Sequence, residues 1–308
     1  METILPVILL LAAGAGLVRW GFFGPGFTDE LNKLVYWVAL PALIIVRVSA
    51  AEVEGGALPR LCGAFFLATL CAVGVAYATA HVARLPERDG GTFVQASFRG
   101  NLAFVGIPIL VYAFSGYPEA EQAEFVALAV LVFGPTMLIY NLLSVAALQL
   151  TGGGSVAAGG KLLFRRLVTN PLILASIVAI LLYLTAGPLP AVPARTLEAL
   201  AALAVPGALL CIGGGLVTAR LRGNVRGIVL ASVIKAGVLP LLAYGTARIF
   251  GLEGAHVVIV LVLAASPTAA ASYVLATQMG GNAGLASGAI ALSTVLSPLS
   301  FFVILLLV

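Results

Sequence analysis

The chain has 308 residues, of which 61% are hydrophobic and 9% are charged, and its formal net charge is +4 at pH 7. About a quarter of the residues in soluble domains are charged, so this composition excludes a soluble globular protein and indicates a polytopic membrane protein. No run of Lys and Arg is long enough to indicate nucleic-acid binding. Cys62, Cys71 and Cys211 lie inside hydrophobic segments without metal-ligand spacing, so we expect no metal site and no bound cofactor.

Membrane crossing takes about 20 apolar residues per helix, and we identify ten segments that meet this criterion. The expected fold is therefore all-α, with transmembrane helices over residues 4–20, 31–48, 58–83, 93–114, 125–150, 170–186, 197–219, 227–250, 256–278 and 285–308.

The two halves of the chain carry similar motifs in the same order. Residues 38–44 (VALPALI) match residues 203–209 (LAVPGAL), and prolines recur in the fourth and ninth and in the fifth and tenth segments, at Pro108, Pro267, Pro135 and Pro298. Five helices per half is an odd number, so the second half must enter the membrane inverted, as in many secondary transporters. We expect one five-helix repeat over residues 1–150, a Gly-rich cytoplasmic linker over 151–163, and a second repeat over 164–308.

Positive charges predict the orientation, because cytoplasmic loops are enriched in Lys and Arg. With both termini outside, eleven basic residues fall on the inner side and four on the outer side. The inner set is Arg19, Lys33, Arg84, Arg88, Arg99, Lys161, Arg165, Arg166, Arg220, Arg222 and Arg226, and the outer set is Arg47, Arg60, Arg195 and Arg248. The sequence thus predicts a multi-pass protein of the cytoplasmic membrane with its N- and C-termini outside.

The fourth and ninth segments are the candidate site, because each has a proline at its centre. Such a proline opens the helix, and freed backbone groups are tolerated in a bilayer only where they line a cavity. Each proline also suits the first turn of a following half-helix, whose N-terminal amides attract anions. We expect the two breaks to cross at the bilayer midplane and to bind the substrate through Asn101, Gly106, Ile107, Pro108, Ser266, Pro267, Thr268 and Ser272.

Two basic residues lie close to these breaks. Lys235 is about ten residues into the eighth segment, where a lysine costs roughly 2.5–3.5 kcal/mol to insert. It either attracts an anionic substrate, occupies a cation site, or is hydrogen-bonded to carbonyls freed by a broken helix. Arg99 either draws anions into a cytoplasmic vestibule or extends to the lipid headgroups.

Other functional classes lack their residues in this sequence. All twelve Asp and Glu residues lie in loops or at the ends of the segments, which argues against a proton relay through membrane carboxylates. Metalloprotease, P-loop, dinucleotide-binding and serine hydrolase motifs are missing, so we expect no enzyme.

Several motifs together resemble the auxin efflux carrier family, which contains plant PIN proteins and bacterial permeases. They are Asn101-x-x-x-x-Gly106-Ile107-Pro108-x-Leu110, Asn170-Pro171, the segment 204–209, Lys235 with Pro240, and Ala265-Ser-Pro267 with Leu275-Ala276. The resemblance covers nearly the whole chain. It implies two inverted five-helix repeats related to the bile-acid symporter fold. In that fold a scaffold of helices 1, 2, 6 and 7 often dimerises, and helices 3–5 and 8–10 form a moving transport domain.

The resemblance also implies a function. Family substrates are organic anions, namely indole-acetate in plants and dicarboxylates such as malate or malonate in bacteria, and Asn101 inherits the role of a substrate contact. Ser266 and Thr268 depart from the plant pattern, which with the short linker favours a bacterial-type permease. We therefore expect a secondary carrier of a small carboxylate or dicarboxylate that works by elevator-type alternating access and forms a homodimer. A Na⁺-coupled symporter of the bile-acid type, a ligand sensor and a channel remain alternatives, with Na⁺ or H⁺ as possible coupling ions.

Overall fold

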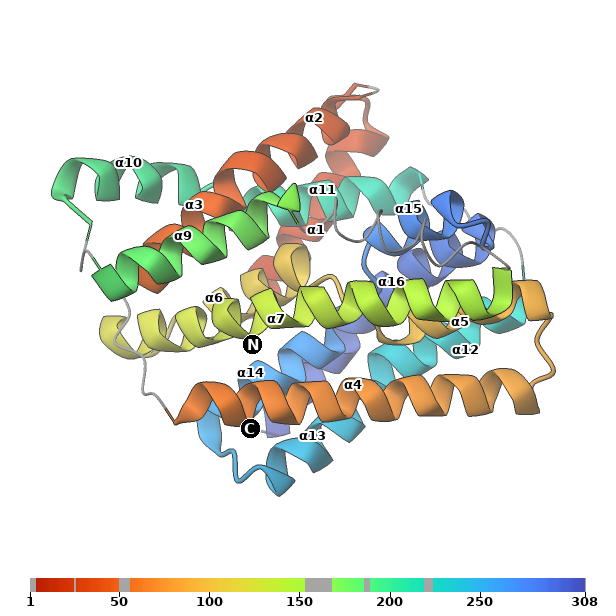
Figure 1. Cartoon of the computed structure of the whole chain (residues 1–308). Helices are drawn as coiled ribbons and strands as arrows, with labels where there is room; N and C mark the ends of the chain where they lie inside the picture. Colours follow the sequence, from red (N-terminus) through yellow and green to blue (C-terminus); the bar gives the residue numbers. More distant parts are fainter. Residues whose placement is uncertain are drawn as a thin grey trace. The chain divides into compact units, whose positions relative to one another are not determined.

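The computed structural model describes residues 4–24, 26–49, 56–152, 168–185, 189–218 and 224–307. Within these ranges the chain is helical apart from short connections and one isolated antiparallel bridge, so the expected all-α fold is confirmed (Figure 1). Of the predicted linker over 151–163, only Thr151 and Gly152 fall within these ranges, at the end of a helix; the rest lies outside the described residues.

The helices follow the predicted segments closely, although several segments are divided. The α-helices, with the π-helical turns η1 to η3, are α1 (Ile4–Arg19), α2 (Phe27–Leu34), η1 (Val35–Ala39), α3 (Leu40–Ser49), α4 (Ala57–Val82), α5 (Glu87–Phe98), η2 (Leu102–Gly106), α6 (Ile107–Ala113), α7 (Glu119–Gly152), α9 (Pro171–Thr185), α10 (Ala191–Ala201), α11 (Ala204–Thr218), α12 (Val225–Val233), η3 (Ile234–Val238), α13 (Leu239–Ile249), α14 (Gly254–Ala265), α15 (Ala271–Gln278) and α16 (Ala283–Leu307).

Six helical stretches in the described part of the chain are long and apolar enough to cross a membrane. They are Phe27–Ser49, Ala57–Val82, Glu119–Leu150, Ala191–Val217, Val225–Ile249 and Ala283–Leu306. Four shorter apolar helices, Leu5–Arg19, Leu102–Ala113, Pro171–Thr185 and Gly254–Ala265, lie in the remaining predicted segments. The protein is therefore a polytopic membrane protein.

Among the described residues there are three π-helical turns, and each ends two residues before a proline: Pro41 after η1, Pro108 after η2 and Pro240 after η3. A proline lacks an N–H and its ring crowds the carbonyl four residues back. In a π-turn the N–H pairs with the carbonyl five residues back, so the helix passes the proline without a break. The Ala236 carbonyl, four residues before Pro240, accepts a hydrogen bond from Ser300 Oγ instead (2.6 Å).

One compact unit comprises Met1–Leu58, Ala103–Gly134 and Val168–Thr218. Its packing depends on two glycines where α1 meets α11. A Cβ added at Gly14 would lie 2.8 Å from Leu210 Cα, and one added at Gly213 would lie 2.8 Å from the carbonyl carbon of Leu11. The two backbones approach so closely that only residues without a side chain fit at these positions.

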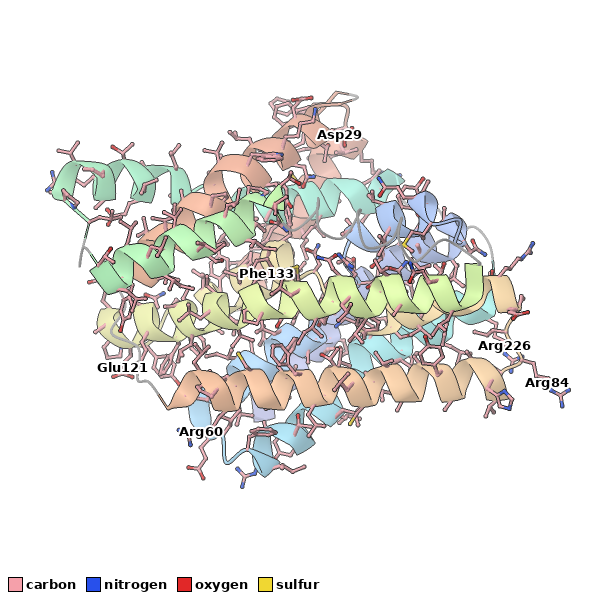
Figure 2. All side chains as sticks on the ribbon, in the orientation of Figure 1. Asp29, Arg60, Arg84, Glu121, Phe133 and Arg226 are labelled. Carbon is pink, nitrogen blue, oxygen red and sulfur yellow. The ribbon has the colours of Figure 1, made fainter. Side chains whose placement is uncertain are left out.

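The second compact unit comprises Pro59–Leu102, Pro135–Leu167 and Ala219–Val308. Within it α12 packs on α5 and α16, and α14 packs on α13 and α16. Figure 1 shows α4 as one unbroken helix of this unit and α14 and α15 as separate pieces. Arg84 and Arg226 lie at the same end of this unit and Arg60 lies at the other (Figure 2).

Candidate functional site

The ninth predicted span consists of two helices, α14 and α15, separated by residues 266–270. Pro267 has no N–H, and the N–H of Thr268 donates to Ser293 Oγ (2.9 Å) instead of to its own helix. The carbonyl of Ala264, four residues before Thr268, thereby loses its helical donor. A carbonyl freed in this way inside a membrane protein needs another partner.

The fourth predicted span is interrupted at the three residues that follow α5. Gly100 forms the antiparallel bridge with Thr268. The N–H of Asn101 donates to the Pro267 carbonyl (2.7 Å). The N–H of Ala269 donates to the Arg99 carbonyl (2.9 Å). The two interruptions therefore lie against each other inside the second unit and satisfy part of each other's backbone.

Lys235 lies where the two interruptions meet. Its side chain is fully buried, and its Nζ donates to the freed carbonyl of Ala264. A Cβ added at Gly100 would lie 3.4 Å from the same Nζ, so the ammonium group also lies close to the first interruption. The carbonyl end of α14 carries partial negative charge, which favours the charged form of this side chain. Of the three roles predicted for Lys235, the hydrogen bond to a freed carbonyl is therefore present in the structure.

Arg99 is also buried, with 4% of its surface exposed. Its guanidinium donates to Asn141 Oδ1 (2.7 Å) and to Ser144 Oγ (3.1 Å), both on α7. The side chain therefore does not extend to the surface of the protein, which the headgroup alternative requires. Its role in a vestibule stays a prediction.

The polar side chains predicted for the site differ in how they are used. The hydroxyl of Ser266 donates to a carbonyl one turn earlier in α14 (3.0 Å), and Thr268 Oγ1 donates to the Ala96 carbonyl (2.7 Å). Asn101 is half-buried, and Ser272 Oγ is buried without a hydrogen bond to any described residue. Asn101 and Ser272 are accordingly the better placed of the four to bind a ligand.

Gly106, Ile107 and Pro108 belong to the first unit, where they join η2 to α6. Pro108 lies in the first turn of α6, as predicted, but the helix does not open there, because η2 leads directly into α6. The expected open helix end at Pro108 is therefore wrong, and the break lies at residues 99–101. At Pro267 the chain does leave the helix, as expected. However, Pro267 does not lie in the first turn of the following helix, because α15 begins four residues later.

A buried polar face on α5 was missed by the sequence analysis. Asp89, Thr92 and Gln95 on α5, and Arg99 directly after it, recur at helical spacing, and each is 4% exposed or less. The predicted span began only at residue 93, so Asp89 and Thr92 were assigned to a loop. Their spacing of three to four residues was the available signal.

Asp89 joins three helix ends. Its carboxylate accepts hydrogen bonds from Asn224 Nδ2 (3.2 Å) and Asn282 Nδ2 (2.7 Å). These two asparagines cap the N-termini of α12 and α16. Asn224 Oδ1 accepts from the N–H of Gly227, and Asn282 Oδ1 accepts from the N–H of Leu285. The carboxylate therefore holds both caps in one rotamer beside the first turn of α5.

The model of the membrane transport protein family matches residues 1–151 and 155–305. The chain belongs to this family. An uncharacterized transporter of Methanothermobacter thermautotrophicus is 26% identical over 303 residues, which cover 97% of this chain and 95% of the relative. An uncharacterized transporter of Methanocaldococcus jannaschii is 24% identical, over 96% and 95% respectively.

This membership confirms the resemblance to auxin efflux carriers drawn from the motifs. The transporter is a multi-pass membrane protein of a transport family and not of an enzyme family, so a small-molecule substrate and a lipid bilayer are its expected partners.

Proposed function

We propose that the transporter is a secondary carrier that moves a small organic anion, a carboxylate or dicarboxylate, across the cytoplasmic membrane by alternating access. The position of Lys235 supports this proposal most directly. Its buried ammonium lies at the contact between two interrupted helices, beside the half-buried Asn101. An ammonium and an amide at such a contact supply the charge and the hydrogen bonds that bind a carboxylate.

The proposed architecture is ten spans arranged as two inverted five-helix repeats, residues 1–150 and 164–308, with spans four and nine crossing near the bilayer midplane. Helices 1, 2, 6 and 7 form a scaffold, and helices 3–5 and 8–10 move in an elevator-type cycle. Two backbone hydrogen bonds support the crossing: the N–H of Asn101 donates to Pro267, and the N–H of Ala269 donates to Arg99. The occurrence of both interruptions within one compact unit supports their movement together.

We also propose that both termini lie outside the cell and that the scaffold helices form a homodimer. Arg84 and Arg226, predicted on the inner side, lie at one end of the second unit, and Arg60, predicted on the outer side, lies at the other end (Figure 2). This arrangement supports the orientation. Chemical cross-linking in lipid nanodiscs tests the dimer.

The central experiment measures uptake of labelled carboxylates and dicarboxylates by the purified transporter in liposomes. Uptake should saturate, and Asn101→Ala and Lys235→Ala should each lower it at least about tenfold, as expected for the loss of a charged or buried hydrogen-bonding group. Lys33→Ala is the control, since Lys33 is an exposed residue paired with Glu30. Unchanged uptake in both site variants would remove these residues from the mechanism.

The same assay separates the alternatives. Replacement of Na⁺ by choline should leave uptake unchanged, because the ammonium of Lys235 already occupies the freed carbonyl of Ala264. Loss of uptake in choline would favour the Na⁺-coupled symporter. Saturable binding without flux would favour a sensor, and flux that does not saturate would favour a channel.

A further inference from the structure

Two buried polar atoms next to the crossing of the interrupted helices have no hydrogen-bond partner among the residues that the structure describes. They are Oε1 of Gln95, on α5, and Oγ of Ser272, in the first turn of α15. Both side chains are fully buried. A membrane protein rarely leaves such atoms unsatisfied inside its fold, so a group from outside the chain is the natural partner.

The two atoms belong to one local arrangement. Gln95 Nε2 donates to the backbone carbonyl of Ser272 (3.1 Å). A carbonyl can only accept, so the nitrogen of the Gln95 amide must face it, and Oε1 must face away from it. The orientation of the amide is thereby fixed, and the unpartnered oxygen is not the result of a reversed amide.

The position of the pair connects it to the proposed substrate site. Gln95 lies on α5, four residues before Arg99, the residue that follows the helix, and Ser272 lies beside Gln95 in the first turn of α15. The Arg99 N–H donates to the Gln95 carbonyl (3.0 Å), so Gln95, with Ser272 bonded to it, lies about one helical turn, roughly 5 Å, from the contact between the interruptions. A small organic acid spans this distance with its carboxylate at one end and another group at the other.

The chemistry of the two atoms selects that group. Gln95 Oε1 needs a hydrogen-bond donor, whereas the hydroxyl of Ser272 both donates and accepts. A second carboxylate accepts only, so it leaves Gln95 Oε1 unsatisfied. An ammonium group donates, but the buried guanidinium of Arg99 opposes another positive charge nearby. A hydroxyl group donates to Gln95 and accepts from Ser272.

We propose that Gln95 and Ser272 form a subsite for a hydroxyl group of the transported anion, so that the transporter selects hydroxy acids over the same acids without the hydroxyl. This inference rests on the proposed function and identifies a substrate class for its site. Gln95 is a specificity residue that the sequence motifs do not mark.

The test compares pairs of acids that differ by one hydroxyl, malate with succinate and lactate with propionate, in binding to the full-length transporter. The wild type should bind the hydroxy acid of at least one pair about tenfold more tightly or better, since a site that hydrogen-bonds a substrate hydroxyl rejects the analogue without it. Ser272→Ala and Gln95→Met should each reduce the ratio of affinities to below about threefold. Ser97→Ala is the matched control, because its buried hydroxyl on α5 is already bonded to the Phe93 carbonyl (2.8 Å) and the ratio should not change.

The outcomes are distinct. Equal affinities for both members of each pair would overturn the subsite and leave the anion carrier standing, with a bound water as the partner of the two atoms. A hydroxyl preference that survives in both variants would also overturn it. Failure of all four acids to bind would count against the proposed function and this inference together. If neither variant folds, as judged by thermal unfolding without ligand, the wild-type ratios alone decide.

Discussion

At the scale of single residues, the buried polar groups of the second unit are satisfied by one another with few exceptions. Lys235 binds the carbonyl that Thr268 leaves free, Arg99 binds two neutral side chains of α7, and Asp89 binds two cap asparagines. Each of these contacts joins residues far apart in the sequence. The polar groups inside this unit therefore hold its helices in one arrangement, because a partner lost from a buried charge costs several kcal/mol.

Asp89 gives a prediction about stability. Asp89→Asn would replace one carboxylate oxygen by an NH₂, which would then face the NH₂ of either Asn224 or Asn282, so one of the two hydrogen bonds would be lost. We expect the variant to lose about 1–3 kcal/mol of unfolding free energy. Thermal unfolding in detergent measures the loss. Glu87→Gln, an exposed substitution in the same turn of α5, should unfold like the wild type, and an equal loss in this control would refute the explanation.

At the scale of helices, close approaches and π-turns decide where side chains lie. The α1–α11 crossing depends on Gly14 on α1 and Gly213 on α11, whereas a Cβ added at Gly215 on α11 would lie within 4 Å of no atom of another described element. The π-turn η3 sets the rotation of the segment that carries Lys235. Glycine and proline at these positions therefore determine packing and side-chain direction, which apolar composition alone does not.

The α1–α11 crossing gives a matched pair of variants. Gly213→Ala would press a methyl group against the backbone of Leu11 and should cost about 1–3 kcal/mol of stability. A Cβ added at Gly215 lies within 4 Å of no atom of a neighbouring described element, so Gly215→Ala should be neutral or slightly stabilising, because alanine favours helix. Thermal unfolding of both variants measures the difference, and equal midpoints would contradict the close approach.

The π-turn before Pro240 gives a prediction about activity. Pro240→Ala restores an N–H that can compete with Ser300 for the Ala236 carbonyl, so an ordinary α-helix becomes possible. One residue fewer in the turn would rotate Lys235 by roughly 100°. We expect anion binding to fall at least about tenfold while the thermal midpoint is kept or raised. The control is Pro41→Ala, which follows η1 in the first unit and should leave binding unchanged; a similar loss there would contradict the link to Lys235.

At the scale of the whole molecule, the orientation in the membrane is the main prediction. With Cys62, Cys71 and Cys211 replaced by alanine, single cysteines at the exposed positions Glu121 and Arg226 report the predicted outer and inner sides of the membrane. A membrane-impermeant maleimide added to intact cells should label Glu121→Cys and should label Arg226→Cys only after lysis. The reverse pattern would place both termini inside.

Much of the architecture could be predicted because it depends on periodic and compositional signals. Apolar length predicts the helices, since an unsatisfied backbone in lipid is too costly for any other arrangement. The motifs around Asn101 and Pro267 predict the family and mark the segments that are interrupted. The position of Lys235 inside an apolar helix predicts that it is buried, which the structure confirms.

The sequence by itself thus determined the all-α class, the membrane setting and the family, because hydrophobic length and local motifs are properties of the chain. The tertiary structure alone decided that the first break lies at residues 99–101 and not at Pro108, that Lys235 binds the carbonyl of Ala264, and that Gln95 lies against Ser272. These facts depend on which freed backbone group meets which side chain, and such meetings join residues as many as 177 positions apart. A local sequence pattern does not predict these contacts, because tertiary packing determines which side chain lies next to a freed backbone carbonyl or N–H.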